Sequence, residues 1–264
     1  MLNVYKRFWQ VNWAEQWQYR ANLLMYLAYW LVSPITYLAV WTTIANAQHN
    51  VSGLTAANFA AYYLTLLPVD ILTSSITIHL LAYRIQNGTI SNELLQPVHP
   101  VLTNILVNNI AFKVLQVIAF VPIWFVLVLL FRPVLTYTWT SLICAVPAIV
   151  LGFALRFLLE STITLIAFWT TRVWAIYQFD SAFSMLLNGA FVPLALLPPW
   201  AQMIAHILPY QLTLSFPVLL LLNQFPAEQI PLNFGLQVFW LVALYALFTF
   251  VWRKAIKQYS AVGA

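Results

Sequence analysis

Three ionisable side chains stand inside stretches that are otherwise apolar, and they are the residues best placed to do chemistry. Arg156 and Glu160 are four residues apart in one apolar run, and Asp70 follows Pro68 in another. A charge near the centre of a bilayer costs at least about 2.5 kcal/mol, so each must be neutralised or used. Because side chains four residues apart share a helix face, Arg156 and Glu160 can form an ion pair.

Each of these charges has a structural and a functional explanation. The Arg156–Glu160 pair would either lock helix packing or take part in substrate passage or gating. Asp70 would be bonded by neighbouring Ser or Thr hydroxyls or left protonated, or it would serve a proton relay, for which the sequence offers few acidic partners. Lys113, near the start of a third apolar run, is expected to extend its amine to the membrane surface.

The remaining reactive residue types are not spaced for catalysis. The four histidines are separated, and the single cysteine, Cys144, lies in an apolar segment, so no metal cluster or thiolate site is expected. The glycines do not form a GxxxxGK[ST] phosphate loop. We therefore expect a chain that is not an enzyme and that binds no metal and no cofactor.

Composition places the chain in a bilayer. Of its 264 residues, 63% are hydrophobic and 6% are charged, whereas soluble domains carry roughly 25% charged residues. A spanning helix needs about 20 apolar residues, so the chain has room for about six such helices. The net charge of +5 is explained by the Lys and Arg residues that membrane proteins gather on their cytoplasmic side. The sequence contains no basic patch of the kind that indicates nucleic-acid binding. The predicted fold class is an all-α integral membrane protein, with residues 1–264 as a single transmembrane domain.

Apolar runs and their interruptions predict six spans. An interfacial helix over residues 1–20 alternates aromatic with charged and polar side chains. The spans are residues 21–44, 59–82, 101–131, 139–168, 181–197 and 232–252. Residues 198–222 are apolar but broken by prolines, which predicts a re-entrant helical hairpin. Its marker residues are Pro198, Pro199, Trp200, Pro209 and Pro217.

Basic residues predict the orientation. With six spans and a cytoplasmic amino terminus, the inside receives eight Lys and Arg residues and the outside one, Arg132. If residues 201–222 crossed instead, the ratio would fall to five against four. Because cytoplasmic loops are enriched in Lys and Arg, both termini are expected in the cytoplasm and the hairpin outside.

Two segments carry a resemblance to a known family. "IQNGTISNELLQPVHP" is similar to the glycine-then-LLxP loop signature of the ABC type 2 permeases, and "FVPLALLPPWAQMIAHILPYQLTLSFPVLLL" is similar to their carboxy-terminal proline pattern. The predicted layout also resembles theirs over nearly the whole chain. Within the family, the chain looks closest to bacterial permeases encoded beside a separate ATPase and often a second permease.

The resemblance implies that residues 83–100 form the cytoplasmic coupling loop that docks on the ATPase. The residue types suit that role, because Gly88 permits a tight turn and Ser91 can cap a short helix. Pro97 would stop that helix, and Glu93 would meet a basic rim on the ATPase. Leu94 and Leu95 would form an apolar knob. A merely solvated loop is the alternative.

The resemblance also implies the partners and the task. Two ATPase subunits would bind ATP and Mg²⁺, and a second copy or a sister permease would complete a dimer in the bacterial cytoplasmic membrane. The expected function is export of a hydrophobic or amphipathic substrate such as a drug, lipid, peptide or glycoconjugate. An ion-coupled transporter or channel acting without an ATPase is the alternative, followed by a membrane enzyme or scaffold.

Overall fold

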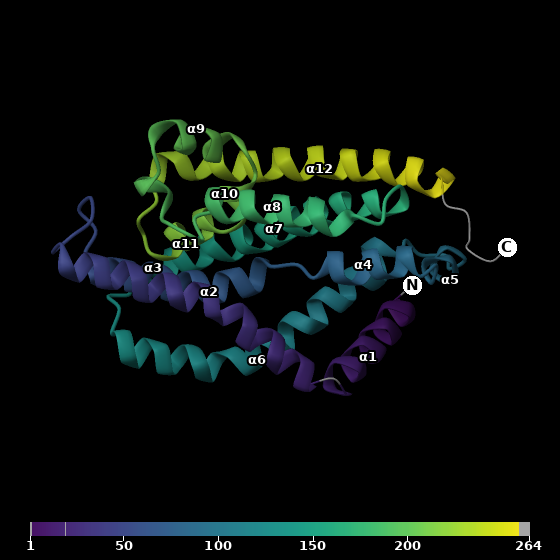
Figure 1. Ribbon diagram of the computed structural model, residues 1–264, viewed down its shortest axis with the longest axis horizontal. Coiled ribbons are helices and arrows are strands. Elements are labelled where there is room, and N and C mark those ends of the chain that lie inside the picture. Colours follow the sequence, from purple (N-terminus) through teal and green to yellow (C-terminus); the bar gives the residue numbers. More distant parts are fainter. Residues whose placement is uncertain (1, 19, 259–264) are drawn as a thin grey trace.

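The apolar runs form long helices that lie along one axis of the molecule (Figure 1). The computed structural model describes residues 2–18 and 20–258. The α-helices are α1 (Leu2–Gln18), α2 (Arg20–Ala47), α3 (Ala56–Thr73), α4 (Thr77–Gln86), α5 (Ile90–Leu94), α6 (Leu106–Phe131), α7 (Trp139–Thr164), α8 (Val173–Leu187), α9 (Pro199–Ile207), α10 (Tyr210–Thr213), α11 (Ser215–Leu221) and α12 (Ile230–Gln258). The shorter turns are η1 (Val101–Ile105), η2 (Leu165–Phe168), η3 (Leu194–Leu196) and η4 (Ala227–Gln229).

Five helical segments of the described chain are long and apolar enough to cross a membrane. They are Leu24–Ala47, Ala56–Gln86, Val101–Phe131, Trp139–Phe168 and Ala227–Gln258. Each contains one of the predicted spans or coincides with it almost throughout. The prediction of an all-helical, multi-pass membrane protein is confirmed at this level.

The span predicted over residues 181–197 is the exception. Helix α8 begins at Val173, inside the segment expected to be a connection, and its 15 residues extend only about 22 Å, less than the roughly 30 Å of a hydrocarbon core. It ends before Gly189, whose φ is +87°. A Cβ at Gly189 would lie 2.5 Å from the Tyr62 hydroxyl oxygen. Close packing against α3 therefore ends the helix where the apolar sequence continues.

The predicted span over residues 59–82 is not one helix but two, α3 and α4. Helix α3 ends at Thr73, and the Ser74 hydroxyl donates to the Ile71 carbonyl at 3.0 Å. Small hydroxyl side chains compete for backbone groups in this way and weaken a helix. On the far side of the break, the Ile76 backbone N–H donates to Asn109 Oδ1 of α6 at 2.8 Å. Side chains from α6 thus hold the interruption open.

Lys113 supports the same interruption. Its amine donates to the Ser74 carbonyl and lies 4.6 Å from the centroid of the Phe153 ring. Only 8% of the residue is exposed. The expectation that Lys113 reaches the membrane surface is therefore wrong, because the end of α3 offers an acceptor where cations are favoured.

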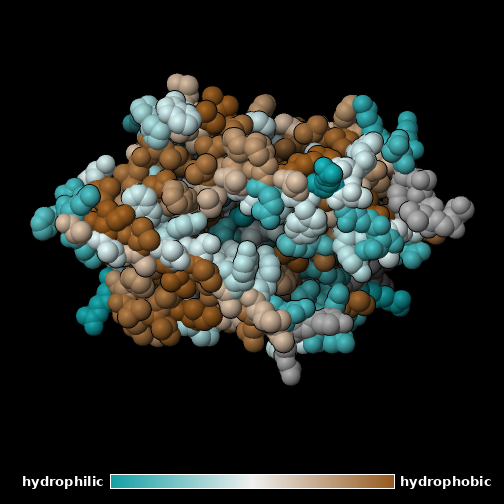
Figure 2. All heavy atoms as spheres, in the orientation of Figure 1, coloured by the Kyte–Doolittle hydropathy of each residue, from teal (hydrophilic) through white to brown (hydrophobic). Residues whose placement is uncertain are grey.

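Helix α3 is the centre of the bundle. The segment Ala56–Gln86, which comprises α3 and α4, has about 67% of its most apolar stretch buried, against 17% to 33% for the other four segments. Helices α2, α6, α7 and α11 pack around it. The outer helices keep exposed apolar faces, and Figure 2 shows such patches over much of one side of the molecule. This distribution suits a lipid surround, where apolar side chains need not be covered by protein.

Residues predicted to form an interfacial helix are helical, as α1, and this helix packs against α6, while its place at a membrane surface stays a prediction. Its buried contact is polar. Asn12 is 3% exposed, accepts from Asn108 Nδ2 at 2.6 Å and donates to Asn104 Oδ1 at 3.5 Å. The apolar neighbour Val11 is 66% exposed. A hydrogen-bonded asparagine cluster thus fixes α1 to the bundle.

The hairpin region folds as α9, α10 and α11. Pro198 and Pro199 begin α9 and Pro209 precedes α10, whereas Pro217 lies within α11. Trp200 is 67% exposed, and α11 packs on α7 and α3. The prolines therefore divide the segment into short helices, while its depth in a bilayer stays a prediction.

The interrupted helix gives a stability prediction. Asn109→Leu should lower the free energy of unfolding by about 1–3 kcal/mol, because it leaves the Ile76 N–H without its acceptor. The same change at the exposed Asn22 is the control. A detergent titration that finds equal stability for both variants would contradict the role assigned to Asn109.

Candidate functional site

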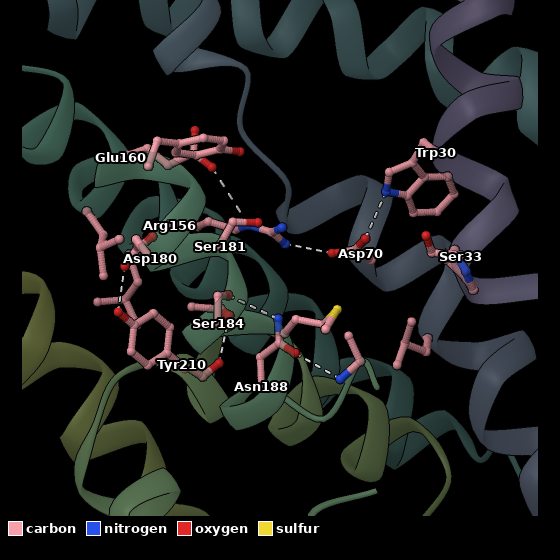
Figure 3. A pocket seen from close by; sticks show the side chains of 18 of the residues that line it. Trp30, Ser33, Asp70, Arg156, Glu160, Asp180, Ser181, Ser184, Asn188 and Tyr210 are labelled. Atoms are coloured by element: carbon pink, nitrogen blue, oxygen red, sulfur yellow. Dashed lines mark hydrogen bonds and ion pairs between the residues drawn. The ribbon is translucent and has the colours of Figure 1, made fainter. Parts of the chain in front are cut away.

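A polar cavity of about 240 Å³ lies between α2, α3, α7, α8 and α10 (Figure 3). Its walls contain all three intramembrane charges singled out from the sequence. The polar side chains around it include Ser33, Asp70, Arg156, Glu160, Asp180, Ser184 and Asn188. The aromatic side chains are Tyr29, Trp30, Tyr37, Tyr177 and Tyr210. Figure 2 shows a hollow near the middle of the visible face, with hydrophilic side chains at its rim.

Asp70 and Arg156 form the central contact of this cavity. Arg156 Nη1 donates to Asp70 Oδ1 at 2.6 Å, and Trp30 Nε1 donates to Asp70 Oδ2 at 3.0 Å. The sequence had suggested that neighbouring Ser or Thr hydroxyls bond the Asp70 side chain. In the described residues its side-chain partners are instead Arg156 and Trp30. The carboxylate instead joins α2, α3 and α7.

The predicted Arg156–Glu160 pair is present but is the weaker of the two contacts. Arg156 Nε lies 3.9 Å from Glu160 Oε1. The Glu160 side chain is 5% exposed and that of Arg156 is 25% exposed. Arg156 therefore makes its shorter contact with Asp70, which is distant in sequence, and its longer contact with Glu160, which is one turn away. Asp70 approaches the end of the guanidinium.

Two further polar pairs in the cavity wall were not predicted from the sequence. The Tyr210 hydroxyl donates to Asp180 Oδ1 at 2.6 Å, and Asn188 Nδ2 donates to Ser184 Oγ at 3.2 Å. Asp180 lies in a segment that its polarity marked as a connection. The four-residue spacing of Asp180, Ser184 and Asn188 was the available signal, since it places them on one face of a helix.

Carboxylates outnumber the basic groups that line the cavity. Asp70, Glu160 and Asp180 face a single guanidinium, that of Arg156. Glu160 Oε2 is buried and makes no hydrogen bond within the described chain. In the described residues no group of three or more His, Cys, Asp or Glu side chains has the arrangement of a metal site. The charged and polar lining of the cavity is suited to binding a polar ligand.

The candidate coupling residues lie elsewhere, at the end of the molecule where Figure 1 places α5. Gly88 turns the chain with a φ of +72°. Ser91 lies inside α5 and donates to the Gly88 carbonyl at 2.8 Å, so it is not the cap we expected. Leu95 is 86% exposed, whereas Leu94 packs against the buried core. Only one of the two leucines is therefore free to meet a partner.

Glu93 already has a partner within the chain. Its Oε1 accepts from Arg84 Nη1 at 2.6 Å, which ties α5 to the end of α4. Burial raises the pKa of Glu93 above its ordinary value, although the Arg84 guanidinium acts in the opposite direction. Pro97, just beyond, is exposed. Glu93 therefore anchors the loop, and a basic rim on a partner would compete with Arg84.

The central ion pair gives a second prediction. Asp70→Asn should lower the free energy of unfolding by about 1–3 kcal/mol, because it leaves the partly buried Arg156 guanidinium with only its weaker partner. The double variant Asp70→Asn/Arg156→Gln should recover part of this loss. Stability is measured by thermal unfolding in detergent. If the loss in the double variant equals the sum of the losses in the two single variants, direct coupling of the two residues is contradicted.

Comparisons with known proteins agree with this membrane architecture. Residues 31–263 match the family model described as ABC-2 family transporter protein. A search of curated proteins found no match. The family match covers most of the chain, from within α2 through the end of α12. The chain therefore belongs to the ABC-2 family of transporter membrane proteins, as a transport subunit that works with an ATP-binding cassette ATPase.

Proposed function

We propose that this chain is the permease subunit of an ATP-driven exporter in the bacterial cytoplasmic membrane. Two ATPase subunits bind ATP and Mg²⁺, and a second copy or a sister permease completes the pathway. The substrate is hydrophobic or amphipathic and crosses beside the polar cavity. Family membership and the position of the cavity inside the helix bundle support this proposal.

One observation carries the coupling mechanism. Asp70 at the cavity and Glu93 at the loop belong to one continuous stretch of chain, α3–α4–α5, which is interrupted at residues 74–76 and again at the Gly88 turn, residues 87–89. A push on α5 reaches α4 through the Arg84–Glu93 pair. The interruption then allows α4 to tilt relative to α3. Interrupted helices are common where a membrane protein must change shape around a site.

Movement of α4 would also act on the far wall of the cavity. Helix α4 packs on α7, which carries Arg156 and Glu160. Lys113 and Asn109 of α6 bind opposite sides of the interruption. A tilt must therefore exchange these contacts or carry α6 along. ATP-driven displacement of the loop is thereby turned into a change of the charged cavity.

The proposed topology has six crossings, with both termini in the cytoplasm and the α9–α11 hairpin at the outer side. Helix α8 together with residues 188–198 forms the fifth crossing, although α8 alone is short. The exposed loop after α4 and the last described turn of α12 lie toward the same end of the molecule in Figure 1. This arrangement matches the predicted eight-to-one distribution of basic residues.

The docking loop gives the test of function. Leu95→Asp should abolish co-purification with the ATPase or lower stimulated ATP turnover at least about tenfold, because a charge at the exposed apolar contact would be desolvated on docking. Ala227→Asp, at an exposed position in η4 just before α12, is the matched control. Both variants should reach the membrane at wild-type levels.

Two results would contradict the proposal. Normal coupling in Leu95→Asp would exclude the docking role of the loop. Transport retained in vesicles that contain no ATP would favour an ion-coupled carrier over an ATP-driven permease.

The topology has its own test. In a Cys144→Ser background, Ser52→Cys and Glu228→Cys should react with an impermeant maleimide in intact cells, and Asn92→Cys only after permeabilisation. All three positions are exposed. If α8 does not cross, Glu228→Cys will be protected, because a five-crossing chain places the loop before α12 inside.

A further inference from the structure

We infer that the cavity between α2, α3, α7, α8 and α10 binds the cationic group of an amphipathic substrate. The inference rests on the proposed export function and names the substrate class of that site. Its basis is the excess of carboxylates over basic side chains in the cavity lining, together with an aromatic wall.

The charges of the cavity do not balance within the described chain. The positive charge of the Arg156 guanidinium is balanced by Asp70, whose carboxylate lies 2.6 Å from it. Glu160 shares the same guanidinium at 3.9 Å and keeps one buried oxygen without a hydrogen bond. Asp180 has only a neutral donor at 2.6 Å, the Tyr210 hydroxyl. Lys113, the next basic side chain, lies near enough for its charge to act on Glu160, but its amine donates to the Ser74 backbone and it is not part of the lining.

Such an excess favours a positive ligand. A buried carboxylate without a counter-charge costs several kcal/mol, and a bound cation removes that cost. An anionic group would instead meet three carboxylates with one guanidinium that is already engaged. Figure 3 shows Asp70, Glu160 and Asp180 arriving from different helices around Arg156, so a ligand between them would face more than one carboxylate.

The aromatic side chains of the cavity also favour a positively charged ligand. Trp30, Tyr37, Tyr177 and Tyr210 line the cavity, and the faces of such rings attract ammonium and related cations. Leucine side chains complete the lining, with Leu66, Leu155 and Leu159 as examples. A cavity of about 240 Å³ is smaller than the roughly 300–1,000 Å³ of drug-sized pockets. It therefore holds only part of a drug-sized cation, and the remaining apolar part of the molecule extends out of it.

Two probes of nearly the same shape and opposite charge test this inference. Tetraphenylphosphonium and tetraphenylborate are applied separately to the full chain, purified with whatever subunits accompany it in nonionic detergent, and binding is measured by equilibrium dialysis. We expect Glu160→Gln to weaken tetraphenylphosphonium binding at least about tenfold, without weakening tetraphenylborate binding. Glu228→Gln, the same change at an exposed residue in the loop before α12, should bind both probes as the wild type does.

A second variant keeps the test decisive. If Glu160→Gln does not yield a monodisperse protein, Asp180→Asn takes its place with the same expected loss. Unchanged tetraphenylphosphonium affinity in the folded variant, or an equal loss in Glu228→Gln, overturns the inference. Tetraphenylborate binding that Arg156→Gln abolishes overturns it as well. Normal assembly with the ATPase alongside such a result would leave the export function standing and reject only the cationic substrate.

Discussion

The contact between Asp70 and Arg156 is the interaction on which the interior of this protein depends. It joins the central helix α3 to α7, and the Trp30 indole adds α2 to the same carboxylate. In a bundle whose outer faces are apolar, helices gain little from hydrophobic association, so packing and polar contacts must define their positions. A buried ion pair with a third donor fixes three helices at one point. It also keeps a polar cavity open where a fully apolar core would close.

The position of this pair relates the cavity to the loop at the end of the molecule. Asp70 lies one turn before α3 ends, and the interruption that follows is held by Asn109 and the Lys113 amine. Helix α4 then leads directly to α5, where Arg84 and Glu93 close the loop. At the interruption, side chains of α6 bind the Ile76 N–H and the Ser74 carbonyl in place of backbone partners. The interruption lies between the charged cavity and the loop that we propose docks on the ATPase.

The sequence predicts most of the long helices because their apolar runs are uninterrupted. Residues 139–168, for example, form α7 and η2 over the expected range. It misplaces α8, since Gln178 and Asp180 give its first half the polarity of a connection, although Asp180 faces a buried cavity. The break in residues 59–82 was readable from the hydroxyl-rich stretch Thr73–Thr77. The pairing of Asp70 with Arg156 was not, because one sequence contains no information on which distant residues approach each other.

Cysteine reactivity tests most directly whether movement of the loop changes the charged cavity, as we propose. Ser181→Cys, in a Cys144→Ser background, places a thiol on the cavity wall. Its rate of reaction with a charged methanethiosulfonate reagent is measured in the assembled transporter, with and without ATP and vanadate. The account predicts a several-fold change of rate with nucleotide, and none when Leu95 is replaced by Asp. The same rate with and without ATP in the chain carrying Leu95 would contradict it.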